Sequence, residues 1–321
     1  MFKKLFKPAL IALTVAAAMS GAQAQEYPTK PVTIIVPTGP AGAVDFMARL
    51  YGEELSKKWK QRAVVENKVG AGGILGAQVA ARSPADGYTI MVAPLAGLAG
   101  NVFRKMAFDP LKDLTPVALL AWSPQVCVTQ PESGLKTWAA LVADAKANPG
   151  KLTFVTYPGT TNHLYMLRLL KMTGMDARLI PYNSQTAGIQ AVMSNQVTAF
   201  CSTTTGVPQL IQGGKLVGLA MTSRDRNPAF PDVPTLRSLG LDFEWLSLMT
   251  MFAPAGTPAN IVAKLQSDVA EILPQPDIQA RVRATGLDPE LRSPRETAQV
   301  ITQSLHQIVE FAREAGVKPE E

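Results

Sequence analysis

The segment TIIVPTGPAGAVD, residues 33–45, runs from an apolar strand through a glycine-rich loop into the start of a helix that continues to residue 59. A helix start leaves backbone N–H groups unpaired and carries roughly half a positive elementary charge, so it can bind a carboxylate or phosphate without a basic side chain. Glycines also shape tight turns between strands and helices. The segment alone therefore predicts either an anion site or a structural turn.

A similar unit lies far downstream. Residues 151–156 predict a strand, residues 157–162 form the loop YPGTTN, and a predicted helix begins at His163. Hydroxyl and amide groups in this loop can donate to an anion, and they can equally cap the helix or lie on the sheet surface. Two such loops predict a ligand that is held between two lobes.

Strand and helix patterns alternate along most of the chain. Predicted strands lie at residues 32–36, 62–66, 88–93, 117–121, 125–129, 152–156, 177–181, 197–201 and 216–222, and predicted helices at 45–59, 74–81, 137–147, 163 onward, 186–194 and 208–212. This alternation predicts an α/β fold with parallel sheet layers. The continuous apolar run at 117–121 is typical of a sheet covered on both faces.

Chain length and the last part of the pattern indicate two domains. Roughly 300 residues exceed what one hydrophobic core comfortably organises. After residue 254 the pattern is purely helical, with helices at 258–273 and 294–315 that we expect to pack on the first lobe. Domain 1 is therefore predicted to be discontinuous, with residues 25–123 and 248–321, and domain 2 comprises residues 124–247. The chain would cross between them near Trp122 and Trp245.

Residues 1–24 are typical of a secretory signal peptide. Three lysines precede an apolar run at residues 9–19, and Ala22-Gln23-Ala24 is a small-x-small cleavage site. The run is too short to span a bilayer, and Gln25 rather than a cysteine follows the cleavage point, so no lipid anchor is expected. The sequence predicts a soluble protein exported to the periplasm.

Composition narrows the classes of partner. The chain is 47% hydrophobic and 17% charged, and its formal net charge of +6 includes three leader lysines, whose removal leaves +3. No basic stripe with interleaved aromatics is present, so we expect no nucleic-acid partner. The only cysteines, Cys127 and Cys201, lie in apolar strand-like runs. An oxidising compartment permits a disulfide, but we expect two buried thiols, because free cysteine is among the most buried residue types.

Catalytic and metal-binding motifs are absent from the sequence. The chain has only two histidines, His163 and His306, and it lacks a GxSxG elbow, an HExxH helix and a cysteine–histidine cluster with metal-ligand spacing. Asp45 stands at a helix start, where a carboxylate caps N–H groups, and this role is favoured over acid–base chemistry. We therefore predict a binding protein with no enzymatic activity, no cofactor and no metal.

Short motifs follow one another in a fixed order along the chain. They are YPTKP at 27–31, VEN at 65–67, GAGG at 70–73, DGYT at 86–89, PGKL at 149–152, GKL at 214–216, PDVPT at 231–235 and APAGTP at 253–258. Together they resemble the Bug family of periplasmic receptors, which serve tripartite tricarboxylate transporters. The resemblance implies a type II periplasmic-binding-protein fold, with a small organic carboxylate between the loops at 37–45 and 156–162, held by backbone amides and two bridging waters.

The resemblance also implies partners. A transport receptor delivers its carboxylate to the membrane permease subunits of a tripartite tricarboxylate-type transporter, and we expect such a receptor to be a monomer. The alternative is a periplasmic sensor subunit that presents the ligand to a signalling receptor such as a sensor kinase. Both readings need the same cleft, so the sequence leaves them open.

The expected ligand-binding residues combine both loops with neighbouring positions. They are Thr38, Gly39, Pro40, Ala41, Gly42, Ala43, Val44, Asp45, Leu95, Thr156, Tyr157, Gly159, Thr160, Thr161, Asn162, His163, Tyr182 and Ser202. The resemblance implies that Val44, Leu95 and Leu98 replace polar residues of the family's pocket, so a fully polar ligand would leave buried oxygens unpaired at about 1–3 kcal/mol each. We therefore expect a carboxylate with an aromatic or extended aliphatic body, bound on domain 2 at Thr160, Thr161 and Ser202.

Overall fold

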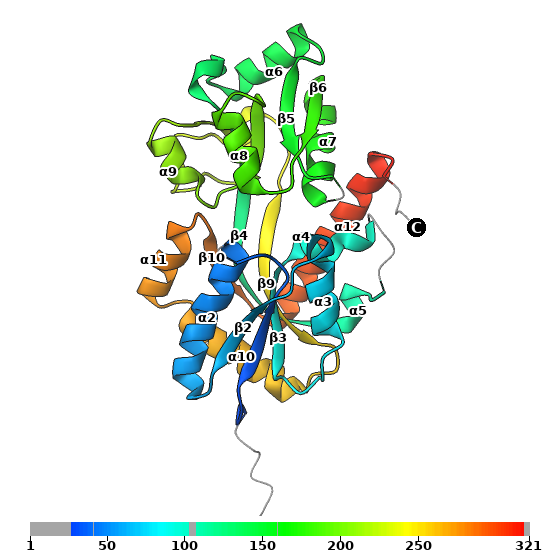
Figure 1. The fold of residues 1–321 in the computed structure, drawn as a ribbon, viewed down its shortest axis with the longest axis vertical. Helices are drawn as coiled ribbons and strands as arrows, with labels where there is room; N and C mark the ends of the chain where they lie inside the picture. Colours follow the sequence, from blue (N-terminus) through cyan, green and yellow to red (C-terminus); the bar gives the residue numbers. More distant parts are fainter. Residues whose placement is uncertain (1–26, 41, 103–106, 159, 318–321) are drawn as a thin grey trace, which may run out of the picture.

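Two long strands join the two α/β lobes of the computed structural model, which describes residues 27–317 except 41, 103–106 and 159 (Figure 1). Strand β4, Leu114–Thr129, is 16 residues long and passes from the lower lobe into the upper lobe. Strand β9, Leu246–Pro254, runs antiparallel beside it and pairs with it from Leu114↔Pro254 to Pro124↔Leu246. The predicted signal peptide at residues 1–24 lies outside the described residues.

Strand β4 is one element where the sequence predicted two. Ser123 and Pro124 read as a break between two apolar runs, yet both stay in the ladder opposite Ser247 and Leu246. Pro124 removes a single N–H donor from the ladder, and the apolar side chains on both sides of it remain buried. At this crossing the lobes are therefore joined by continuous sheet and not by a loop.

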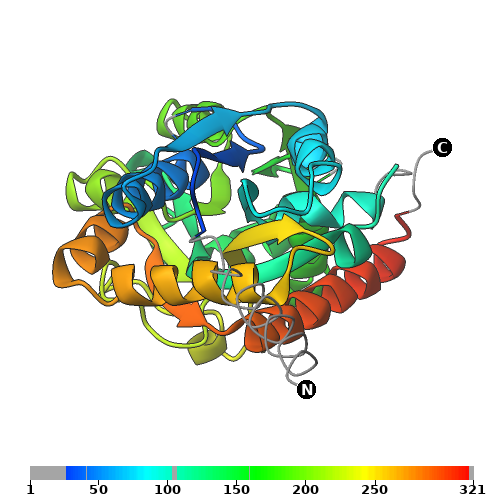
Figure 2. The same cartoon turned by 90° about the horizontal axis from the view of Figure 1, so that it is seen from below.

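Helices cover both faces of the sheet in the lower lobe (Figure 2). Three of its strands are parallel: β1, Val32–Val36, β2, Ala63–Asn67, and β3, Thr89–Pro94. Strand β9 is antiparallel to β3 and to β4, and β10, Asp288–Arg292, is antiparallel to β4. One apolar cluster lies under helices α2, Ala43–Trp59, α10, Ala259–Ile272, and α11, Pro276–Ala284. The other lies under α3, Ile74–Ala81, α4, Leu95–Leu98, and α12, Pro294–Glu314, near the short α5, Pro110–Asp113, and the turns η1, Ala71–Gly73, and η2, Ala99–Val102.

The upper lobe repeats this layering. Strands β5, Leu152–Thr156, β6, Ala177–Pro181, and β7, Ala199–Thr203, are parallel, and β4 is antiparallel to β7 and to β8, Val217–Met221. Helices α6, Trp138–Ala147, and α7, Thr161–Thr173, cover one face, and α8, Gln185–Met193, and α9, Val207–Gln212, cover the other. The turns η3, Pro131–Ser133, and η4, Arg237–Leu239, complete the lobe. The predicted two-lobe α/β fold class is confirmed.

Two expectations about the sheet and the last part of the chain were wrong. The sheet is mixed and not purely parallel, and the segment after residue 254 contains strand β10 and the unpredicted helix α11. All five residues of β10 are half-buried, so DPELR has no apolar run that could predict a strand. The other predicted helices and strands are present, with ends shifted by up to two residues.

The two cysteines form a disulfide, contrary to the expectation of buried thiols. Cys127 of β4 and Cys201 of β7 are directly opposite each other in the antiparallel ladder, and both are fully buried. Their separation of 74 residues along the chain carries no information about this register. Only the pairing of β4 with β7 brings the two sulfur atoms together.

The end of helix α12 reaches from the lower lobe to the upper lobe. Its middle packs in the lower core through Ile301 and Leu305, while Glu314 forms an ion pair with Arg168 of α7. The Arg168 guanidinium also lies 4.1 Å from the centroid of the Phe311 ring. Within the described part of the chain, neither this helix nor another is apolar enough over a sufficient length to cross a membrane.

Candidate functional site

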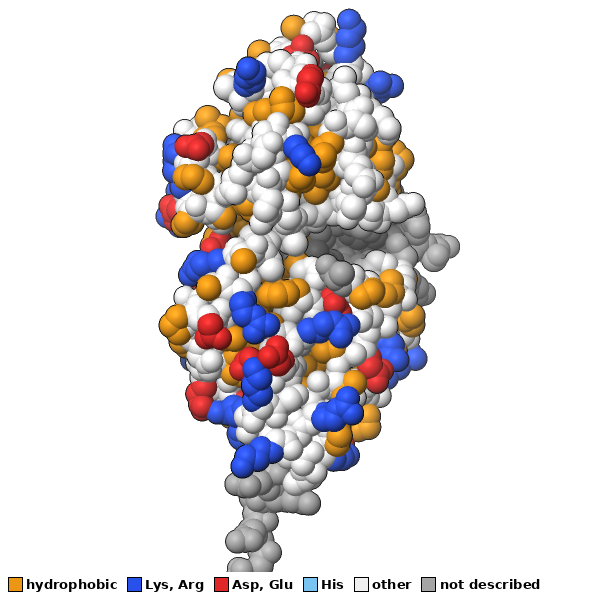
Figure 3. All heavy atoms as spheres, turned by 60° about the vertical axis from the view of Figure 1, so that its left-hand side comes forward, with side chains coloured by type: hydrophobic (Ala, Val, Ile, Leu, Met, Phe, Trp, Pro, Cys, Tyr) orange, Lys and Arg blue, Asp and Glu red, His pale blue; other side chains and the backbone are white. Residues whose placement is uncertain are grey.

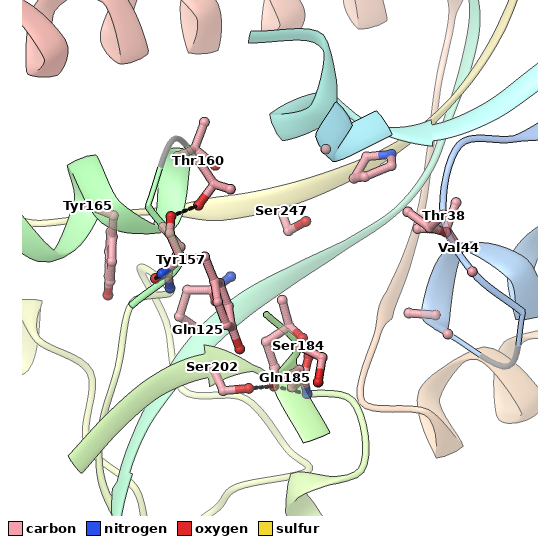
Figure 4. A pocket seen from close by; sticks show the side chains of 18 of the residues that line it. Thr38, Val44, Gln125, Tyr157, Thr160, Tyr165, Ser184, Gln185, Ser202 and Ser247 are labelled. Atoms are coloured by element: carbon pink, nitrogen blue, oxygen red, sulfur yellow. Dashed lines mark hydrogen bonds between the residues drawn. The ribbon is translucent and has the colours of Figure 1, made fainter. Parts of the chain in front are cut away.

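A cavity of about 590 Å³ lies between the lobes and draws its walls from both (Figure 4). The lower lobe contributes Thr38, Gly39, Gly42, Ala43, Val44, Ala71, Gly72, Ile74, Pro94 and Gly100; the upper lobe contributes Tyr157, Thr160, Thr161, Asn162, Tyr165, Asn183, Ser184, Gln185, Phe200, Ser202 and Thr203; and Gln125, Trp245, Ser247 and Met249 come from the crossings. In the close view Thr38 and Val44 face Thr160 and Tyr157 across the cavity, with Ser247 between them.

Helix starts from opposite lobes point their first turns at this cavity. Helix α2 begins after Gly42, which has no side chain to cap it, and α7 begins after Thr160, whose side chain makes no cap hydrogen bond. The Thr160 hydroxyl instead donates to the Tyr157 carbonyl at 2.6 Å. Helix α8 also starts here, but its N-cap Ser184 already accepts from the Ala187 amide. The positive ends of α2 and α7 therefore favour an anion in the space between them.

The cavity lining is uncharged. Among the described residues that line it, none is Asp, Glu, Lys, Arg or His. On the face drawn in Figure 3, basic and acidic side chains are interspersed over the lower lobe and form no field of one sign. An anion in the cavity would therefore be held by helix dipoles and neutral donors and not by an ion pair.

Three hydroxyl groups of the lining are buried without a hydrogen-bond partner in the described structure: Thr38 Oγ1 in the first loop, the Tyr157 phenol in the second loop and the Tyr165 phenol in α7. Burial raises the pKa of Tyr157, so its hydroxyl stays protonated and remains a donor at neutral pH. A buried unpaired polar group costs about 1–3 kcal/mol, which a ligand oxygen would recover. Thr38 Oγ1 from the lower lobe and the Tyr157 phenol from the upper lobe are therefore suited to receive an acceptor from the ligand.

Other polar groups of the upper lobe are already fixed by hydrogen bonds. Asn162 donates to the Cys201 carbonyl at 3.2 Å and accepts from the Tyr157 amide at 3.3 Å, which ties the second loop to strand β7. Gln185 donates to the Thr205 carbonyl at 2.9 Å, and the Ser202 hydroxyl donates to the Thr203 carbonyl at 3.0 Å. This wall is thus preorganised before a ligand arrives.

The structure brings together most of the expected site residues. Those that line the cavity are Thr38, Gly39, Gly42, Ala43, Val44, Tyr157, Thr160, Thr161, Asn162 and Ser202. Those that are described but not part of its lining are Pro40, Asp45, Leu95, Thr156, His163 and Tyr182. Ala41 and Gly159 lie outside the described residues.

The residues that stand back from the cavity have structural partners. Asp45 is buried and binds both Arg49, through two contacts of 2.9 Å, and the Asn67 amide. His163 Nδ1 lies 3.0 Å from the Thr156 hydroxyl. Leu95 is buried on the opposite face of β9 from Met249. These contacts support the loops and the core, and the three residues lie outside the cavity lining.

The stability of the fold should depend on pH through His163. Burial lowers the pKa of this imidazole, so the folded state favours its neutral form. The resulting stabilisation is complete above the unfolded-state pKa of roughly 6.5 and is lost as the pH falls through the lower folded-state pKa. We expect acidification to lower the free energy of unfolding of the wild type more than that of His163→Gln, measured by urea denaturation across this range. The exposed His306→Gln is the control and should keep the wild-type profile.

Sequence reasoning missed the residues that come from the crossings and from the start of α8. Gln125 lies in β4, Ser247 and Met249 lie in β9, and Trp245 precedes β9. Alternation places them on one face of the strands, but the sequence does not indicate which face borders the cleft. The start of α8 carried a usable signal, because Asn183-Ser184 precedes a helical pattern as an N-cap does.

Comparisons with known proteins agree with this geometry. A family model described as "Tripartite tricarboxylate transporter family receptor" matches residues 47–317. Protein BugT of Bordetella pertussis is 33% identical over 302 residues, which cover 92% of each chain. The solved structure of R. palustris Rpa4515 with adipate has a TM-score of 0.83 at 29% identity and covers 92% of this chain and 100% of that one. The structure of MatC from Rhodopseudomonas palustris with bound malate has a TM-score of 0.79 at 30% identity and covers 89% and 100%.

Proposed function

The chain belongs to the tripartite tricarboxylate transporter family of receptors, and from this premise we propose that it captures a small organic carboxylate in the cavity between its lobes. The observation that carries the proposal is the meeting of two helix starts, α2 and α7, whose N-cap residues make no side-chain cap bond, at a cavity with no charged side chain among its described residues. Dipoles and neutral donors can hold a carboxylate there.

The receptor serves a transporter, so its partners are a small carboxylate and the permease subunits in the membrane. We place it in the periplasm as a monomer, with a discontinuous domain 1 at residues 25–123 and 248–321 and domain 2 at 124–247. The predicted signal peptide at residues 1–24 supports export. A ligand that binds both lobes more tightly when they are close together shifts the protein toward that state.

We assign the ligand's carboxylate to the α7 start at Thr160 and Thr161, and its body to the apolar part of the lining. That part consists of Val44 and Ile74 from the lower lobe, Phe200 from the upper lobe and Met249 from β9. We do not assign Leu95 to this wall, because its side chain is buried and does not line the cavity. The adipate in the related R. palustris structure supports an extended aliphatic body, whereas the malate in the second one is shorter and more polar.

A thermal-shift screen tests the proposed function. We expect at least one carboxylate to raise the melting temperature among mono- and dicarboxylates with aliphatic and aromatic bodies, because a ligand that binds only the folded state stabilises it by mass action. Adipate-like and benzoate-like compounds should give larger shifts than malate and citrate. Stabilisation by sugars, amines or peptides while all carboxylates fail would refute the site, and a preference for citrate would refute the ligand body. Chelator should leave the shift unchanged.

A further inference from the structure

Trp245 is shared by two cavities. The residue immediately precedes strand β9 and lines the ligand cleft together with Ser247 and Met249. It also lines a second cavity of about 580 Å³, whose other walls include Leu246 and Leu248 of β9 and Val300 and Ile308 of α12. Alternation along β9 explains this arrangement, because residues 247 and 249 point to one face of the strand and residues 246 and 248 to the other. The Trp245 side chain therefore stands between the two spaces.

Aromatic contacts from both lobes hold the indole in place. Its ring centroid lies 5.5 Å from that of Tyr165 in α7 and 5.9 Å from that of Phe311 in α12. Phe311 is in turn covered by Arg168, which forms an ion pair with Glu314. Trp245 also packs at the edges of two apolar cores, one in each lobe. A side chain that is braced in this way has a defined position and can act as a fixed wall.

We propose that Trp245 determines specificity by setting the length of ligand that the cleft accepts. The inference rests on the proposed carboxylate-binding function. The indole ring of Trp245 closes the cleft on the side of the second cavity, so the ring limits the length of a bound ligand. Removing the ring joins the two spaces and gives a longer chain room to extend past β9 toward α12, where Leu246, Val300 and Ile308 offer apolar contacts. The same cavity offers Arg292 to a far carboxylate, and its lining also includes the acidic Glu244 and Glu310.

The test is a length series of α,ω-dicarboxylates from succinate to sebacate, with affinities measured by calorimetry. The wild type should prefer one chain length and bind the longest members poorly. Trp245→Ala should move the preferred length upward and improve the ratio of long-chain to short-chain affinity by at least tenfold. Trp245→Phe keeps a ring that can pack on Tyr165 and Phe311 but shortens the wall, and we expect an intermediate shift. Trp122→Ala is the matched control: this partly buried tryptophan of β4 is outside both cavities and should keep the wild-type length preference.

Two results would overturn the inference while leaving the proposed function intact. One is an unchanged length preference in both Trp245 variants, and the other is the same shift in Trp122→Ala. If the wild type binds no carboxylate, the proposed function fails by itself. In that case a crystal structure of Trp245→Ala or Trp245→Phe tests whether the indole separates the two cavities. Two cavities that become continuous support the inference, and cavities that stay separated because Tyr165 or Phe311 moves into the gap contradict it.

Discussion

Replacing both cysteines by alanine should lower the free energy of unfolding by about 4 kcal/mol. The Cys127–Cys201 disulfide closes a loop of 74 residues, and the loss of chain entropy in the unfolded state grows with loop length to roughly this value. It also joins β4, the strand that crosses between the lobes, to β7, which carries Ser202 into the cavity. Urea denaturation of the oxidised wild type and of Cys127→Ala/Cys201→Ala measures the difference.

Reductant provides the control for this prediction. It should shift the urea midpoint of the wild type toward that of the double variant and leave the double variant unchanged. Because both sulfur atoms are fully buried, reduction needs prior unfolding, so the equilibrium must be approached from the denatured side. Equal midpoints for the wild type and the double variant without reductant would show that the disulfide does not stabilise the fold.

Thr160→Asp should weaken carboxylate binding on the order of 100-fold. Thr160 is the N-cap of α7 and lines the cavity, so an aspartate there places a negative charge beside the ligand's carboxylate. Two unit charges about 5 Å apart at an effective dielectric constant of about 20 repel by about 3 kcal/mol. Aspartate is also a good N-cap, so the protein should stay folded, with an unchanged or higher melting temperature. Calorimetry with the carboxylate found in the thermal-shift screen measures the loss.

Two neutral variants separate charge from geometry in this test. Thr160→Asn keeps an N-cap of the same shape as aspartate without the charge, and we expect affinity within a few-fold of the wild type. Thr160→Val removes the hydroxyl, which already donates to the Tyr157 carbonyl, so its effect should come from loosening the loop and amount to about 1 kcal/mol. If Thr160→Asn weakens binding as much as Thr160→Asp, the helix start does not act through its charge.

The local parts of the site could be predicted from sequence because their physics is local. A glycine-rich loop between a strand and a helix predicts a helix start with unpaired amides wherever the rest of the chain lies, and residues from 37–45 and 157–162 both line the cavity. The alternation of strands and helices likewise predicted the α/β class. Asp45, which was expected among the ligand-binding residues, lies outside the cavity lining, and its carboxylate binds Arg49 and Asn67.

What could not be predicted depends on pairing between distant segments. Gln125 and Met249 face the cleft because of the register in which β4 and β9 pair, and the sequence of either strand alone does not determine this register. Leu95 was expected to line the cleft, but the short helix α4 directs its side chain into the apolar core on the other side of β9. The disulfide follows the same rule, because the sulfur atoms meet through the β4–β7 register.

The passage of β4 and β9 between the lobes has a mechanical consequence. Pairs such as Trp122↔Leu248 and Ser123↔Ser247 keep the two strands hydrogen-bonded where the lobes meet. When one lobe rotates relative to the other, a hydrogen-bonded pair of strands spreads the rotation over many backbone dihedral angles. The elastic energy of the strand pair then rises steadily with the angle between the lobes. We expect any lobe movement that closes the cavity on a ligand to bend the paired strands and to cost elastic energy. Opening of the lobes would return this energy and so favour release of the ligand.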